Sequence, residues 1–131
     1  LDNLMPNTRY VLEVEVGDRL DTTIGPYQVQ LLAGGVVLAA DGSVTPADGA
    51  FATVTLEYTA AASDPQLGLA LEIRLVGMGG SGIQVNFDNV RLSATRVSTT
   101  VAPAASLVGL FLCSLAGLTV VGTRKLRAIV N

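Results

Sequence analysis

An uninterrupted apolar run near the C-terminus constrains this chain more than any other feature of the sequence. Residues 104–123 contain no charged side chain, and about 20 helical residues at a rise of 1.5 Å cover the roughly 30 Å hydrocarbon core of a bilayer. Three basic residues, Arg124, Lys125 and Arg127, follow at once. The run therefore predicts one membrane-spanning helix over 104–123 and a basic cytoplasmic tail over 124–131.

The charges indicate how such a span is oriented. Before residue 99, five arginines stand against 11 acidic residues, a net charge of −6, whereas residues 124–131 carry +3. Basic residues beside a span tend to stay in the cytoplasm. We therefore predict a single-pass protein of the bacterial inner membrane, with a periplasmic N-terminal domain. The basic residues would contact membrane lipid, and the acidic domain disfavours nucleic acid.

Six segments before residue 95 have the apolar and polar alternation of half-buried strands. They are 10–16, 27–32, 36–40, 51–59, 67–76 and 83–92. Short strands at spacings of about ten residues, separated by Gly, Pro and Asp turns, are typical of an antiparallel sandwich. We predict an all-β, jelly-roll-like sandwich over 1–94, a linker over 95–103, and then the membrane helix. Export would require a signal peptide, so we expect sequence upstream of Leu1, including further strands.

The last predicted strand changes its facing partway along. Val85 and Phe87 share one face, but Val90 and Leu92 fall on the opposite parity. A shift of face within a strand predicts a β-bulge near Asp88.

No arrangement of residues indicates catalysis or a cofactor. Histidine is absent, which removes the commonest general base and nitrogen ligand. Glu13 and Glu15 share an outward face and could form a carboxylate pair, but solvated strand charges are the favoured explanation. The loop 77–82 matches G-x-G-x-x-G but precedes a strand pattern rather than a helix, which favours a hairpin loop over a phosphate site. We predict no catalytic residue, no cofactor and no enzyme activity.

Asp88 is the one metal candidate, and a weak one. Calcium needs six or more oxygen ligands, and loop acids such as Asp18, Asp21 or Asp48 could supply some. The alternative is a side chain that stabilises the bulge through local backbone amides. The second reading is favoured, so no metal site is predicted.

A stripe of small residues runs along the predicted membrane helix, formed by Ala105, Gly109, Cys113 and Gly117. Small residues every four positions allow a second helix to approach closely, so the stripe predicts contacts with other membrane subunits. Small residues are also common in membrane helices without such a partner.

The segments NTRYVLEVEVGDRLDT, YQVQLLAGGVVLAA and VNFDNVRLSA, with the apolar and basic tail, resemble exported proteins of the PEP-CTERM sorting family. The resemblance implies a jelly-roll-like domain and a tail read by exosortase. The family's Val-Pro-Glu-Pro is replaced here by Val101, Ala102, Pro103 and Ala104, so an unprocessed tail would remain an anchor.

Together these patterns lead to the hypothesis of a membrane-anchored, non-catalytic accessory subunit of a bacterial envelope complex, for example an energy-transducing or photosynthetic one. The alternative is an exported matrix protein that binds carbohydrate. The aromatic residues fall on apolar strand faces, so the carbohydrate hypothesis depends on fold analogy alone.

Overall fold

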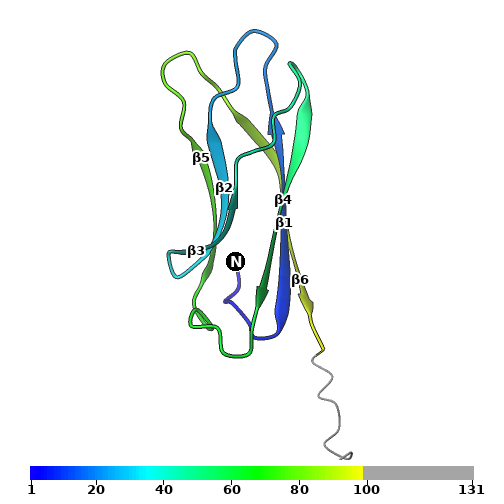
Figure 1. The fold of residues 1–131 in the computed structure, drawn as a ribbon, viewed down its shortest axis with the longest axis vertical. Coiled ribbons are helices and arrows are strands. Elements are labelled where there is room, and N and C mark those ends of the chain that lie inside the picture. Colours follow the sequence, from blue (N-terminus) through cyan, green and yellow to red (C-terminus); the bar gives the residue numbers. More distant parts are fainter. Residues whose placement is uncertain (99–131) are drawn as a thin grey trace, which may run out of the picture. The chain divides into compact units, whose positions relative to one another are not determined.

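The computed structural model describes residues 1–98, which form two three-stranded antiparallel sheets facing each other (Figure 1). The strands are β1 (Thr8–Gly17), β2 (Tyr27–Ala33), β3 (Val36–Asp41), β4 (Phe51–Ala60), β5 (Leu71–Gly77) and β6 (Asn86–Arg96). No helix occurs among the described residues. The predicted all-β antiparallel sandwich is therefore confirmed.

One sheet has the strand order β4-β1-β6 and the other β3-β2-β5. Each central strand pairs antiparallel with both neighbours. The links 18–26, 42–50 and 78–85 therefore lie at one end of the sandwich. The N-terminal segment, the Gly34–Gly35 turn and the loop 61–70 lie at the other end (Figure 1). This turn has positive φ at both glycines, as a tight two-residue hairpin between β2 and β3 requires.

The core fills the space between the two central strands. On β1 the inward side chains Tyr10, Leu12, Val14 and Val16 are buried, whereas the glutamates between them are not. Facing them from β2 are buried Tyr27, Val29 and Leu31, and β4 adds Val54 and Leu56. The faces predicted from the alternation of these strands are confirmed.

Several strand boundaries differ from the prediction, among them the start of β6, which lies at Asn86 rather than at residue 83. β5 begins at Leu71 rather than at residue 67, because residues 64–69 form a turn in which the Leu67 amide donates to the Asp64 carbonyl oxygen at 3.2 Å. Gly68 takes a positive φ of 78° there. β6 runs to Arg96, where a linker was expected, because its polar end still pairs with β1: Thr95 lies opposite Arg9. Backbone pairing with β1 therefore extends the C-terminal end of β6 beyond its apolar residues.

The predicted bulge in the last strand is confirmed. The pairing of β1 with β6 shifts register between Glu13 and Glu15, and Asn89 has a positive φ of 49°. The extra residue lets both Phe87 and Leu92 pack against the core although their spacing is odd.

The predicted membrane helix, its stripe Ala105, Gly109, Cys113 and Gly117, and the basic residues 124, 125 and 127 lie outside the described residues. Within residues 1–98 there is no helix that could cross a bilayer.

Shortening a core side chain on β1 should destabilise the sandwich strongly. Leu12 is fully buried and lies between Leu56 and Leu92 on the neighbouring strands. We expect Leu12→Ala to lower the free energy of unfolding by about 2–5 kcal/mol. Val37→Ala on the exposed face of β3 is the matched control and should cost less than about 0.5 kcal/mol in the same denaturant titration. Equal losses would contradict this account of the core.

The phenol of Tyr58 links the end of β4 to the following loop, since its hydroxyl donates to the Asp64 carboxylate. This hydrogen bond, together with burial, raises the pKa of Tyr58 to about 12. The folded-state pKa exceeds the unfolded value of about 10, so the stabilisation is complete below pH 10. It should disappear as the pH rises through 12. Denaturation midpoints measured from pH 9 to 12 should fall more steeply for the wild type than for Tyr58→Phe, and parallel curves would contradict the linkage.

Candidate functional site

A cavity opens between β5, β6 and the N-terminal segment. Its volume is about 480 Å³, within the range of about 300–1,000 Å³ typical of small-molecule sites. Leu71, Leu92 and Ala94 supply apolar lining, and Asp2 and Arg96 are charged residues of the lining. The cavity combines an apolar surface with a few polar groups, as a site for a small organic ligand requires.

The N-terminal segment is held in place as a wall of this cavity. The Leu71 amide donates to the Asp2 carbonyl oxygen at 3.0 Å, and the Leu4 amide donates to the Leu69 carbonyl oxygen at 2.9 Å. Asn3 forms an antiparallel bridge with Ala70. The Leu4 side chain is fully buried and anchors the segment in the core. These bonds fix the Asp2 backbone beside the cavity.

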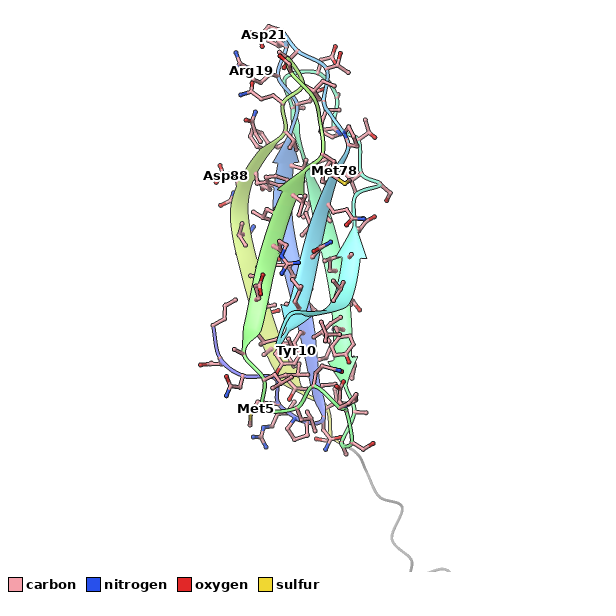
Figure 2. The ribbon with its side chains drawn as sticks, turned by 90° about the vertical axis from the view of Figure 1, so that its left-hand side faces the viewer. Met5, Tyr10, Arg19, Asp21, Met78 and Asp88 are labelled. Carbon is pink, nitrogen blue, oxygen red and sulfur yellow. The ribbon has the colours of Figure 1, made fainter. Side chains whose placement is uncertain are left out.

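Tyr10 is the polar group most firmly fixed in the cavity lining. Its residue is 2% exposed, and its hydroxyl oxygen accepts a hydrogen bond of 2.8 Å from the Met5 amide. Figure 2 shows Tyr10 and Met5 at the same end of the sandwich. Among the described residues no acceptor is found for the phenol hydrogen, so this hydrogen is free to bond a ligand in the cavity.

A second cluster of polar groups lies on the outer face of the β4-β1-β6 sheet, at the bulge. The Asn89 side-chain amide donates to Glu15 Oε2 at 2.9 Å, and the Asn89 backbone amide donates to Asp88 Oδ1 at 2.7 Å. Asp88 points away from the sandwich in Figure 2. The left-handed backbone of Asn89 thus holds two carboxylates on one surface, and Asp88 bonds a local amide as a bulge-stabilising side chain does. Glu13, the other half of the predicted pair, lies opposite Arg91 instead.

The loop acids proposed as calcium ligands do not surround Asp88. Asp18, Asp21 and Asp48 line a separate cavity of about 250 Å³ at the end of the sandwich formed by the inter-sheet links. Arg19 binds both carboxylate oxygens of Asp21 at 2.8 and 2.9 Å and also bonds Gln84. Among residues 1–98 no group of three or more His, Cys, Asp or Glu could hold a metal ion.

The glycine-rich loop 77–82 connects β5 with β6, and a strand rather than a helix follows it. Gly82 has a positive φ of 83°. A dinucleotide site needs a helix N-terminus at this position, and none follows. The predicted hairpin is also wrong, because β5 and β6 belong to different sheets and the loop crosses from one sheet to the other.

Comparison with known proteins places this sandwich among cyclases. The sequence model of the HpiC1-like family, described as HpiC1 cyclase, matches residues 1–93. This chain belongs to the HpiC1-like cyclase family. No curated protein matches it.

Several solved structures from Fischerella sp. TAU are similar. The Stig cyclase Fisc, in complex with (3Z)-3-(1-methyl-2-pyrrolidinylidene)-3H-indole, is 38% identical with a TM-score of 0.67, over 72% of this chain and 52% of that one. A cyclase in complex with 4-(1H-indol-3-yl)butan-2-one is 37% identical with a TM-score of 0.65, over 73% and 53%. This chain therefore spans about half the length of these relatives.

These findings overturn three predictions from the sequence. The resemblance to PEP-CTERM proteins is wrong as a family assignment, because residues 1–93 match a cyclase family. The predicted function, a membrane-anchored accessory subunit or a carbohydrate-binding matrix protein, is contradicted by the cyclase relatives. The prediction of a non-enzyme is wrong for the same reason.

The physical origin of the error lies in the motif that supported it. The motif FDNVRL, residues 87–92, forms the bulged part of β6. The ring centroids of Phe87 and Tyr27 lie 5.9 Å apart in an edge-on arrangement. Asn89 has left-handed backbone geometry, and Leu92 packs against the core. Such a motif indicates how the last strand packs onto the sandwich, and it carries no information about function. The cavity residues Asp2, Tyr10 and Arg96 were missed because they meet only in the fold. Tyr10 lies on the same face of β1 as the buried residues Leu12 and Val14, and this position suggested a purely structural role.

Removing the Tyr10 hydroxyl should loosen the cavity wall without unfolding the sandwich. We expect Tyr10→Phe to cost about 0.5–1.5 kcal/mol and to speed hydrogen exchange at the Met5 amide, which loses its acceptor. Tyr27→Phe is the matched control, because it removes a hydrogen bond to the Val44 carbonyl oxygen far from Met5. Unchanged exchange at Met5 in Tyr10→Phe would contradict the assigned hydrogen bond.

Proposed function

We propose that this protein is an enzyme of the cyclase class that binds an indole-bearing small molecule in the cavity between β5, β6 and the N-terminal segment. The observation that carries the proposal is the match of residues 1–93 to the HpiC1-like cyclase family. Two solved relatives at 37% and 38% identity hold indole compounds, which supports the ligand class.

The chemistry of the cavity suits such a ligand. An indole is flat and largely apolar, and its ring edge can pack against Leu71 and Leu92 while polar substituents reach Asp2, Tyr10 or Arg96. A ring closure that leaves the composition unchanged needs one proton delivered to the substrate and one removed from it. The Asp2 carboxyl and the Tyr10 hydroxyl are the proton-transfer groups of the cavity.

The carboxylate pair at the bulge offers a second location for the acid. Glu15 and Asp88 lie on an open surface beside a residue with left-handed backbone geometry. Backbone outliers of this kind are found at functional sites more often than elsewhere. An acid in the cavity and an acid at the bulge predict different effects of Asp2→Asn and Asp88→Asn on the reaction rate.

The finer features predicted from the sequence are kept here as proposals. These are the jelly-roll character of the sandwich, a single apolar helix over 104–123 in contact with membrane lipid, and a periplasmic N-terminal domain. They concern where the enzyme works and are independent of the cyclase assignment.

Ligand binding can be measured directly because the chain has no tryptophan, so indole fluorescence comes from the ligand alone. We expect the emission anisotropy of 4-(1H-indol-3-yl)butan-2-one to rise when it is titrated with the full chain in mild detergent. Ala94→Phe, which fills the cavity, should weaken binding at least about tenfold. Thr95→Phe, on the opposite face of β6, is the control and should not. Equal binding by both variants would place the ligand elsewhere.

Turnover distinguishes the two acid locations. Incubating the full chain with indole substrates of the relatives and following products by mass spectrometry should reveal a ring-closed product. If the acid is in the cavity, Asp2→Asn should lower the rate by about 10²-fold or more, with Asp88→Asn close to wild type. The reverse pattern would move the acid to the bulge, and no product with any indole substrate would reject the proposed activity.

A further inference from the structure

The chain has two methionines, and both are accessible to solvent. Met5 precedes β1 and is 44% exposed, whereas Met78 follows β5 and is 50% exposed. An accessible thioether is oxidised by peroxides to a sulfoxide, which reductases convert back. The surroundings of the two residues differ, because Met5 lines the cavity of the proposed ligand site beside Tyr10 and Met78 does not (Figure 2).

The backbone around Met5 is fixed although its side chain is accessible. On one side the Leu4 side chain is fully buried. On the other side the Pro6 carbonyl oxygen accepts a hydrogen bond of 3.0 Å from the Thr8 hydroxyl. The Met5 amide itself donates to the Tyr10 hydroxyl oxygen at 2.8 Å. The thioether therefore stands on a rigid segment next to the phenol, and its position depends on side-chain rotation.

The Tyr10 hydroxyl has one bonding position that the described residues leave open. Its oxygen accepts from the Met5 amide, and among residues 1–98 no acceptor takes its hydrogen. A thioether sulfur is only a weak acceptor, so the reduced Met5 side chain does not compete for this hydrogen. A sulfoxide oxygen is a strong acceptor. The methionine side chain has three rotatable bonds, enough to fold back toward a hydroxyl that its own amide already contacts.

We infer that Met5 is an oxidation site whose sulfoxide closes the cavity to ligands by accepting the Tyr10 phenol hydrogen. In the oxidation, the sulfur forms a bond to one oxygen of hydrogen peroxide and gives up two electrons. The O–O bond breaks, and the second oxygen leaves as water. A methionine sulfoxide reductase with a dithiol reverses the change and yields water and a disulfide. The effect on ligand binding rests on the proposed function, whereas the oxidation of Met5 does not.

Two consequences of the sulfoxide act against a bound indole. The ketone oxygen of a ligand such as 4-(1H-indol-3-yl)butan-2-one loses the phenol hydrogen as a donor. The sulfoxide also replaces an apolar group by a polar one in a cavity that Leu71 and Leu92 make apolar. The same change at Met78 touches neither the phenol nor this lining.

Peptide mapping after peroxide treatment tests whether Met5 is modified in the folded protein. The full chain in mild detergent carries Cys113→Ala, because a thiol reacts with the same reagent. Since the two methionines are similarly exposed, we expect their rates of conversion to agree within about threefold. Conversion of Met78 with Met5 left intact would overturn the inference.

Ligand binding separates the two methionines. In Met78→Leu protein only Met5 is oxidised, and the dissociation constant of 4-(1H-indol-3-yl)butan-2-one should rise by about tenfold, the equivalent of roughly one hydrogen bond. Treatment with the reductases should restore it. Met5→Leu is the matched control, and peroxide treatment should leave its dissociation constant at the value measured before treatment. Equal weakening in both variants, or none in Met78→Leu, would overturn the inference.

A stability measurement tests the capture of the phenol hydrogen without any ligand. Oxidation of Met5 should lower the urea midpoint of Met78→Leu protein less than that of the same protein with Tyr10→Phe, because only the phenol can bond the sulfoxide. Equal shifts would overturn the inference. A protein that shows this difference but never binds an indole rejects only the proposed function. A protein that binds equally well before and after conversion of Met5 rejects only the oxidation switch.

Discussion

The packing of β1 against β2 is the interaction on which the rest of the sandwich depends. Each is the central strand of its sheet and pairs on both sides, so each can bury an unbroken row of inward side chains. Leu12 and Val14 on one strand and Val29 and Leu31 on the other are fully buried. Burial of this kind supplies the main favourable free energy of a domain this small. The four outer strands are positioned by pairing to these two.

The bulge at Asn89 then decides how the last strand uses this core. Without the extra residue, Phe87 and Leu92 could not both point inward. With it, one end of β6 packs its aromatic ring on Tyr27 and the other reaches the cavity at the far end. The same turn lifts Asp88 to the outer surface beside Glu15. A single irregular residue therefore sets the positions of both groups of residues that could serve an enzyme.

The exposed side of the sandwich along β6 and the relationship to longer cyclases belong together. A chain that matches about half of its solved relatives presents a sandwich that is closed along β3 and β4 and exposed along β6. The cavity lined by Leu92, Ala94 and Arg96 lies on the exposed side, where apolar and charged residues come together.

The strands, the faces of their side chains and the bulge could be predicted from the amino-acid sequence, because side-chain alternation is a local property with a period of two residues. It missed the turn at 64–69 and the last residues of β6, where hydrogen bonds to distant segments override the local pattern. Only the tertiary structure brought Asp2, Tyr10 and Arg96 to one cavity, since they come from the N-terminal segment, the first strand and the last strand. The pattern of apolar residues specifies which side chains are buried. The chemistry of a site depends on which residues, distant in the sequence, the folded chain brings close together.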